Sequence, residues 1–188
     1  IKRLPFQKGK GKNHPYPKEE LVKTSQLAGL KDGTVVTLEL LIKEVIVDAQ
    51  RGKDFGVKLS YEIQEEAGGI AQALGMAKNF VGNDSVVVIL GDNLFEGNIK
   101  DYINEFEMQG SGARIFLKEV GLKAARRFGI AVVDGNNVSY VEEKPQNPKS
   151  NLAMTGLYMF DSGVFEIIKT LRPSGRGELE ITDTIDYY

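Results

Sequence analysis

The sequence predicts an α/β protein with a mixed, mainly parallel β-sheet flanked by helices. Three observations indicate this fold class. Val86–Leu90 is apolar at every position, as expected of a strand that is covered on both faces. Before it, residues 69–81 carry apolar side chains at the 3.6-residue period of an amphipathic helix. Residues 134–137 (DGNN) separate two short apolar runs and form a strong hairpin signal, which adds an antiparallel pair to the alternating pattern.

The other elements follow from the same criteria. Residues 1–34 are expected to be largely irregular because Pro5, Pro15 and Pro17 interrupt any helix or central strand. From residue 34 onward, strands and helices alternate. The remaining predicted elements are a short helix at 18–27, strands at 45–47, 57–63, 113–120, 130–133, 138–142 and 155–160, and helices at 99–108 and 163–171, the last with Asp161 and Ser162 as its N-cap.

The composition favours one globular domain and excludes several functions. The chain has 188 residues, and about 150 residues per domain is typical. With 24 basic and 26 acidic side chains, the net charge of −2 lacks the basic surplus of a nucleic-acid-binding protein. No apolar run approaches the roughly 20 residues that span a bilayer, and no export signal is visible, so we expect no membrane partner and a cytoplasmic location. The chain has no cysteine, which excludes thiol chemistry, and the single histidine, His14, disfavours a Ser-His-Asp triad.

The first candidate site follows the buried strand. Asp92 comes two residues after Val86–Leu90, and ligands of open α/β sheets bind beyond the carboxyl ends of the strands. A carboxylate there is well placed to hold Mg²⁺, which prefers oxygen ligands and phosphate. The competing interpretation is that Asp92 and Asn93 only turn the chain.

A second candidate lies between a predicted strand and helix, at residues 64–69 (QEEAGG). Paired glycines let backbone N–H groups approach a ligand closely at a helix N-terminus. The amide of Gln64 both donates and accepts hydrogen bonds, which suits a nucleobase edge. The competing interpretation is an ordinary strand–helix loop.

Two further segments carry charge suited to a phosphorylated sugar. Glu143 and Lys144 close a predicted strand, where the carboxylate can accept sugar hydroxyls and the ammonium can contact phosphate. Arg176 lies between two glycines, and its guanidinium matches the geometry of a phosphate. The competing interpretations are a solvated strand end and an exposed turn arginine.

Together, in this order and spacing, these segments resemble one family closely. The sequence resembles the sugar-1-phosphate nucleotidylyltransferases, above all the glucose-1-phosphate thymidylyltransferases, which implies a Rossmann-like fold of the nucleotide-diphospho-sugar transferase type. The resemblance covers roughly residues 45–186. The segments that carry it are 64–73 (QEEAGGIAQA), 86–95 (VVVILGDNLF), 128–132 (FGIAV), 141–150 (VEEKPQNPKS), 155–158 (TGLY) and 176–183 (RGELEITD).

The resemblance implies roles for single residues. Gln64 and Gly69 match the positions that read the edge of thymine or uracil, and Asp92 matches the aspartate that binds the cofactor Mg²⁺. Lys144 and Arg176 match cations that hold the sugar phosphate and, with Asp92, make up the implied catalytic set. The positions around the glucosyl group are matched by Gly129, Glu143, Met154 and Gly156.

The implied reaction is nucleotidyl transfer from dTTP to glucose-1-phosphate, which gives dTDP-glucose and pyrophosphate. A uridylyltransferase that uses UTP is the alternative within the family, because one Gln and one Gly serve either base. The alternative from another class is a non-catalytic or regulatory module that binds nucleotide sugars. The resemblance also implies a homo-oligomer.

The sequence departs from the family pattern at both ends. The family opens with an apolar strand and a glycine-rich loop that cradles the triphosphate, and residues 1–15 do not match that opening. The second aspartate that binds Mg²⁺ in the family has no counterpart before Tyr188. We therefore expect one nucleotidyltransferase domain over residues 1–188, incomplete at the N-terminus and truncated at the C-terminus.

Overall fold

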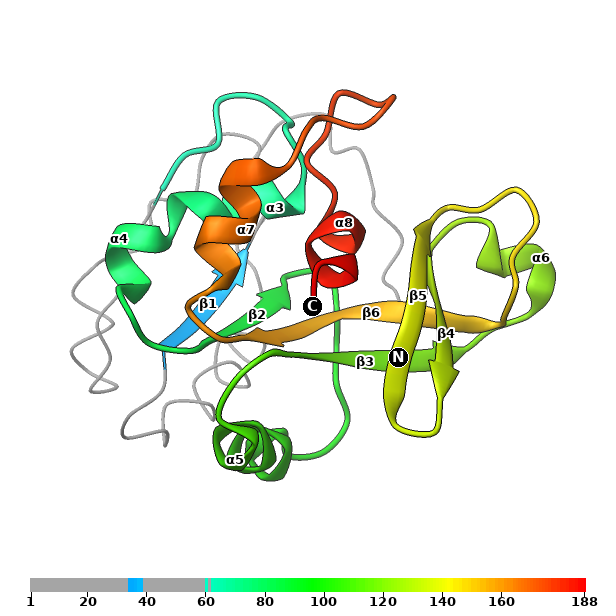
Figure 1. Ribbon diagram of the computed structural model, residues 1–188, viewed down its shortest axis with the longest axis horizontal. Helices are drawn as coiled ribbons and strands as arrows, with labels where there is room; N and C mark the ends of the chain where they lie inside the picture. The colour runs from blue at the N-terminus through cyan, green and yellow to red at the C-terminus, as the bar shows by residue number, and fades with distance from the viewer. Residues whose placement is uncertain (1–33, 39–59, 61) are drawn as a thin grey trace, which may run out of the picture.

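The computed structural model describes residues 34–38, 60 and 62–188 (Figure 1). The predicted helix at 18–27 and the predicted strand at 45–47 lie outside these residues, as does most of the predicted strand at 57–63. Residues 60, 62 and 63, which are described, are not in a strand, so that prediction is wrong where it can be compared.

The strands are β1 (Thr34–Leu38), β2 (Val86–Leu90), β3 (Ala113–Glu119), β4 (Gly129–Asp134), β5 (Asn137–Glu143) and β6 (Leu152–Phe160). The helices are α3 (Ile70–Met76), α4 (Lys78–Val81), α5 (Lys100–Gln109), α6 (Leu122–Ala125), α7 (Val164–Thr170) and α8 (Ile181–Asp186).

The described strands form one mixed sheet with the order β1-β2-β6-β4-β5, and β3 pairs with β6 as well. β1 and β2 are parallel, and β6 is antiparallel to β2, β3 and β4. It follows that β1, β2 and β3 run in one direction, as alternating strands and helices predict. However, β6 runs the opposite way between β2 and β3. The mixed sheet is therefore confirmed, but β1–β2 is the one parallel pair among the described strands.

Helices cover both faces of the sheet. Val86 and Val88 of β2 pack into the cluster that contains α3, α7 and α8. Val87 and Ile89, on the opposite face, pack with α5 and the side of β6 that faces it. Figure 1 shows α3, α4 and α7 on one side of the sheet and α5 on the other. The prediction that Val86–Leu90 is covered on both faces is confirmed.

The sequence predicts most of the described elements, but β1, α6 and α8 are not among the predicted ones. The predicted helix at 69–81 is two helices, α3 and α4, because at Ala77 the chain leaves the α3 pattern and its N–H bonds to Leu74 O at 3.0 Å. The hairpin of β4 and β5 forms as predicted. The N-cap of α7 is Gly163 and not Asp161 or Ser162 as predicted, although Asp161 accepts a hydrogen bond from the N–H of Gly163 at 2.8 Å. Within the described part of the chain, no helix has the length and apolar character needed to cross a bilayer.

Candidate functional site

The turn after β2 brings Asp92 to the carboxyl end of the strand, as predicted. The N–H of Asn93 donates to the carbonyl of Leu90 at 3.0 Å, which closes the turn. The amide nitrogen of Asn93 donates to Asp92 Oδ1 at 2.7 Å, and its Oδ1 accepts the N–H of Gly156 at 3.1 Å. Asn93 therefore fixes the Asp92 carboxylate relative to β6. The turn interpretation of Asp92 and Asn93 is confirmed, and the role of Asp92 as a metal ligand stays a prediction that this turn is compatible with.

Gly156 is a position of close approach between β6 and this turn. A Cβ at Gly156 would overlap the side-chain amide of Asn93 and lie 2.8 Å from the Cβ of Leu90. The resemblance assigns Gly156 to the positions around the glucosyl group. The structure places it against Asn93, the residue after Asp92.

Gly129, Met154 and Glu143 lie together, as their assignment to one sugar subsite requires. A Cβ on Gly129 would lie 3.2 Å from the sulfur of Met154 and 3.3 Å from Glu143 Oε2. It would also lie 2.8 Å from Cγ2 of Thr182. The absence of a side chain at Gly129 thus lets Thr182, Met154 and Glu143 pack closely against the start of β4.

A hollow of about 290 Å³ brings together residues from three separate parts of the sequence. Five of its lining residues are predicted site residues, and they come from the loop before α3, the end of β5 and the loop before α8. The lining residues are Gln64, Ala67, Gly69, Ile70, Glu143, Lys144, Arg176, Glu178, Glu180 and Ile181. We call this hollow the central pocket.

The loop before α3 forms one wall of the central pocket. Gln64 Nε2 donates to the carbonyl of Gly69 at 3.1 Å and to Gln72 Oε1 at 2.6 Å. Gly69 has a φ of 94°, and a Cβ there would overlap the carbonyl oxygen of Leu179. The N–H of Leu179 donates to Gly68 O at 2.8 Å, so the backbones of the two loops lie against each other. Gly69 is thus required by this contact, whether or not it also contacts a ligand.

Lys144 has an unusual backbone conformation at the edge of the central pocket. Its φ is 45°, the one left-handed value for a residue other than glycine among the described residues. Such conformations cost about 1–3 kcal/mol and persist where the surroundings impose them. The N–H of Lys144 donates to Phe128 O at 3.1 Å, and its ammonium lies 3.2 Å from Glu143 Oε1. The strained backbone thus holds the ammonium beside the carboxylate.

Arg176 is held by carboxylates. Glu180, which is buried, accepts hydrogen bonds from Arg176 Nε at 3.1 Å and Nη2 at 2.6 Å. Nη2 also lies 3.1 Å from Glu178 Oε2 and 3.5 Å from Glu143 Oε1. Burial raises the pKa of Glu180, but the hydrogen bonds from Arg176 and Ser174 outweigh it and hold this pKa below its usual value. The same hydrogen bond to Glu180 raises the pKa of Arg176.

The Asp92 turn and the central pocket lie on the same side of the molecule. Met154, Gly156 and Tyr158 alternate along β6 and therefore face one side of the sheet. Met154 approaches the Gly129 corner, whereas Gly156 bonds to the Asp92 turn. Burial raises the pKa of Tyr158, and the negative charges of Glu143 and Asp92 raise it further. β6 thus joins the two halves of the site.

Asp92 fits a magnesium ion that arrives with phosphate. Within the described ranges, no three His, Asp or Glu side chains converge into a metal cage. Mg²⁺ is commonly held by one or two carboxylates together with waters and substrate phosphates, and Asp92 supplies one carboxylate on an exposed turn.

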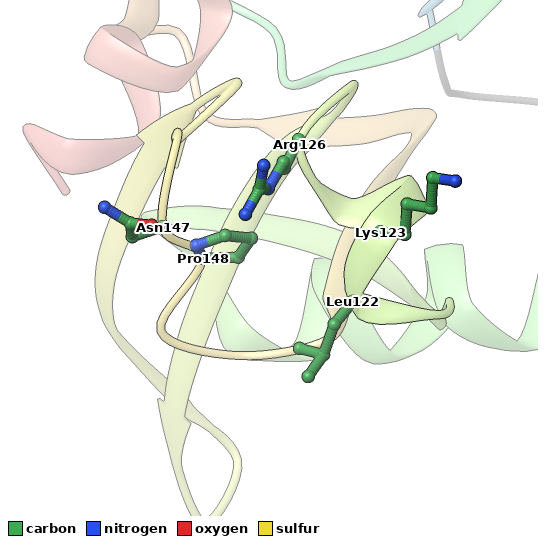
Figure 2. Close-up of a pocket in the computed structure, with 5 residues that line it drawn as sticks. All are labelled: Leu122, Lys123, Arg126, Asn147 and Pro148. Atoms are coloured by element: carbon green, nitrogen blue, oxygen red, sulfur yellow. The ribbon is translucent and has the colours of Figure 1, made fainter.

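A second hollow, of about 540 Å³, shares no lining residue with the predicted site. It lies between α6 and the loop after β5, and its lining residues are Leu122, Lys123, Arg126, Asn147 and Pro148. Figure 2 shows Arg126 extending toward Pro148, whereas Lys123 extends away from it. We call this the α6 hollow, and it contains none of the carboxylates of the candidate site.

Three residues of the site were not among the predicted ones. Glu180 and Glu178 hold Arg176, and Asn93 fixes the Asp92 turn. Arg176 and Glu180 are four residues apart, a spacing that predicts an ion pair on a helix, but here the segment precedes α8 and is not helical. For Asn93 no comparable signal exists, because its partner Gly156 is 63 residues away.

Comparison with known proteins identifies the family. A family model for nucleotidyl transferases matches residues 18–188. The chain therefore belongs to the nucleotidyl transferase family. It is also similar to a solved structure from Bacillus anthracis, provisionally described as a glucose-1-phosphate thymidylyltransferase in complex with a sucrose. That similarity has a TM-score of 0.73 and 43% identity and covers 90% of this chain and 68% of the other.

Three curated relatives show the range of named activities. The low-salt glycan biosynthesis nucleotidyltransferase Agl11 of Haloferax volcanii is 47% identical over 71% of this chain and 37% of its own length. A glucose-1-phosphate thymidylyltransferase of Neisseria meningitidis is 41% identical over 84% of this chain and 54% of its own length. The UTP–glucose-1-phosphate uridylyltransferase AglF of Haloferax volcanii is 34% identical over 86% and 66%. The chain thus spans about half the length of the curated relatives it matches.

Proposed function

We propose that this protein transfers the nucleotidyl group of dTTP to glucose-1-phosphate, which gives dTDP-glucose and pyrophosphate. The observation that carries the proposal is the central pocket, where Gln64, Glu143, Lys144 and Arg176 line one hollow. A nucleotide sugar needs a group that recognises its base, an acceptor for the hydrogen bonds of its sugar hydroxyls, and cations for its phosphates. These four residues can supply such groups. The relative from Neisseria meningitidis, named a glucose-1-phosphate thymidylyltransferase, supports the choice of substrates.

The reaction needs positioning and charge neutralisation from the protein. An oxygen of the sugar phosphate attacks the α-phosphorus of the triphosphate and forms a new P–O bond, while the bond to the pyrophosphate leaving group breaks. The attacking oxygen already carries negative charge at neutral pH, so no side chain has to accept a proton. Lys144 and Arg176 offset the charge of the sugar phosphate, and Glu143 orients the hexose through its hydroxyl groups.

Mg²⁺ is the proposed cofactor, with Asp92 as the carboxylate that holds it. When bound, the ion offsets negative charge on the phosphates. Asn93 keeps the Asp92 carboxylate in place through the bond at 2.7 Å. The bond from Gly156 to Asn93 ties that carboxylate to β6, which two residues earlier contributes Met154 to the sugar corner.

UTP is the alternative nucleotide. The relative AglF is named as a uridylyltransferase, and Gln64 presents an amide that can pair with either pyrimidine. We also place the protein in the cytoplasm, where nucleoside triphosphates are made, as a homo-oligomer. The resemblance to the family supports this assignment, and light scattering coupled to size-exclusion chromatography tests the oligomeric state.

Pyrophosphate release tests the proposed reaction. The purified protein is incubated with glucose-1-phosphate, Mg²⁺ and either dTTP or UTP, and we expect faster release with dTTP. Equal or faster release with UTP would favour the uridylyltransferase. Binding of the nucleotide sugar without any release would instead indicate a binding module.

Two variants separate the proposed roles. Asp92→Asn should reduce turnover by about 100-fold or more while the unfolding transition stays unchanged, because the metal ligand loses its charge. Lys144→Ala should raise the KM for glucose-1-phosphate more than the KM for dTTP. An equal rise in both KM values would contradict the assignment of Lys144 to the sugar phosphate, and an active Asp92→Asn enzyme would contradict the metal site.

A further inference from the structure

The loop between Ser174 and Glu180 is organised around the side chain of Arg176. The N–H of Gly177 donates to Ser174 O at 2.8 Å, and the N–H of Ser174 donates to Glu178 O at 2.8 Å. Ser174 Oγ accepts the N–H of Arg176 at 3.1 Å and donates to Glu180 Oε1 at 2.6 Å. The hydroxyl of Ser174 thus links the backbone of Arg176 to the carboxylate that holds its guanidinium.

The guanidinium is bound along one edge. Its contacts to Glu180, Glu178 and Glu143 all use Nε or Nη2. Nη1 makes no hydrogen bond or ion pair with the part of the chain that the structure describes. An arginine has five N–H donors in a fixed plane, so a carboxylate that holds the Nε edge leaves the Nη1 edge to another anion.

The three carboxylates differ in how firmly they hold this edge. Glu180 makes two hydrogen bonds, and its side chain is 7% exposed. Glu178 and Glu143 each make one contact to Nη2, and their side chains are 33% and 24% exposed. A single ion pair between exposed side chains contributes little to stability and can be replaced by a contact to a ligand. Breaking a buried ion pair that makes two hydrogen bonds costs much more free energy.

We propose that Glu180, with Ser174, is a positioning residue that fixes Arg176 by its Nε edge and presents the Nη1 edge to the phosphate of the sugar substrate. This inference rests on the proposed function, because it takes the ligand of the central pocket to be a sugar phosphate. Glu178 and Glu143 occupy Nη2 in the absence of substrate, and binding of the phosphate displaces the weaker of these contacts. Glu180 acts through Arg176 and does not touch the substrate.

A purely structural role for Glu180 has different consequences. Glu180 immediately precedes α8, and its carbonyl accepts the N–H of Thr184 at 3.4 Å. If Glu180 served only to anchor α8, its replacement would lower stability and weaken every ligand alike. A positioning role predicts loss confined to the sugar phosphate, and the loss should disappear when Arg176 is already altered.

The test measures the binding of glucose-1-phosphate by calorimetry for the wild type, Glu180→Gln, Arg176→Lys and the double variant. We expect Glu180→Gln to raise the Kd for glucose-1-phosphate about tenfold and the Kd for dTTP less than twofold, since hydrogen bonds to charged groups are individually strong. In the Arg176→Lys background, Glu180→Gln should raise the Kd for glucose-1-phosphate no further. Glu166→Gln, which removes an ion-paired carboxylate on α7, is the matched control and should leave both Kd values unchanged.

The possible results separate this inference from the proposed function. If the wild type binds glucose-1-phosphate but releases no pyrophosphate, the proposed reaction fails, whereas the Kd ratios still decide the positioning role. Additive effects in the double variant, or equal loss for both ligands, would overturn the inference. No binding of glucose-1-phosphate by the wild type would overturn both. Should Glu180→Gln not fold, Ser174→Ala keeps every charge and should raise the Kd for glucose-1-phosphate about threefold, and an unchanged Kd would refute the proposal.

Discussion

Gly156 shows how one residue can join two halves of a site. Its N–H bonds to Asn93, and the absence of a Cβ lets the Asn93 amide lie against β6. Because Asn93 in turn bonds to Asp92, the position of the proposed metal ligand depends on a glycine that is distant in sequence. The requirement here is one of space, since the φ of Gly156 is not among the positive values.

Gly156→Ala should therefore impair activity and stability together. The added methyl group would displace Asn93 and with it the Asp92 turn, and overpacking of this kind costs about 1–3 kcal/mol. Urea denaturation and pyrophosphate release measure the two effects. Gly121→Ala is the control, because Gly121 has a φ of −65° and no atom within 4 Å of an added Cβ. If Gly156→Ala behaved like Gly121→Ala, the described contact with Asn93 would be wrong.

The individual site residues differ in how well sequence predicts them. The sequence places Glu143 and Lys144 at the end of a strand, and the structure has them there, at the edge of the central pocket. For Arg176 the sequence predicts a cation between flexible glycines, but its Nε edge is bound by Glu180. A sequence shows that the two charges are four residues apart, but it does not show that the carboxylate is buried.

Among the elements, α5 determines how one face of the sheet is covered. Ile103 and Phe106 of α5 are buried against Val87, Ile89 and β6, whereas Met108 is 80% exposed. The amphipathic pattern of this segment predicts that arrangement. The helix therefore contributes to stability chiefly through its buried side.

Phe106→Ala should lower the free energy of unfolding by about 3–5 kcal/mol, because a buried aromatic ring is lost and a cavity remains. Met108→Ala, two residues further along the same helix, should change it by less than about 0.5 kcal/mol. Urea denaturation with a constant m-value measures both. Similar losses for the two variants would contradict the orientation of α5.

A cluster of exposed ion pairs links α4 to α7. Glu166 of α7 lies 2.6 Å from the ammonium of Lys78 in α4 and 2.8 Å from that of Lys169. Hydrogen bonds from Lys169 and Lys78 lower the pKa of Glu166 to about 2, against 4.5 for the free side chain. A lowered pKa in the folded state means that the ionised carboxylate stabilises the fold above pH 4.5 and loses this effect as the pH falls toward 2.

Glu166→Gln should therefore be less stable than the wild type at neutral pH, and the difference should shrink between pH 4.5 and 2. Because these side chains are exposed, the effect should be small and should weaken in salt. Thermal unfolding measured across this pH range provides the comparison, with the exposed Glu96→Gln as control. A difference that grows on acidification would contradict the ion pair.

The elements also show why local sequence predicts where strands occur better than it predicts their order and direction in the sheet. β2 and the β4–β5 hairpin have local signals, namely an unbroken apolar run and a turn sequence. The direction of β6 depends on its insertion between β2 and β3, which no local pattern encodes. The short helices α6 and α8 were not predicted, because four and six residues are too few to show a clear period.

At the scale of the whole molecule, the sheet gathers segments that are far apart in the sequence. The loop before α3, the turn after β2, the end of β5 and the loop before α8 meet on one side of β6. The order of these segments in the sequence suggests a family, but only the packing shows that three of them line one hollow and that the turn after β2 is joined to β6 through Asn93 and Gly156. The central claim is that this central pocket, and not the larger α6 hollow, is where the nucleotide sugar binds.

A crystal structure of the protein soaked with dTDP-glucose tests this claim most directly. We predict electron density for the hexose beside Glu143 and Met154, for the phosphates beside Lys144 and Arg176, and for the base at Gln64. Density for the ligand in the α6 hollow, between Arg126 and Pro148, with the central pocket unchanged, would contradict the account.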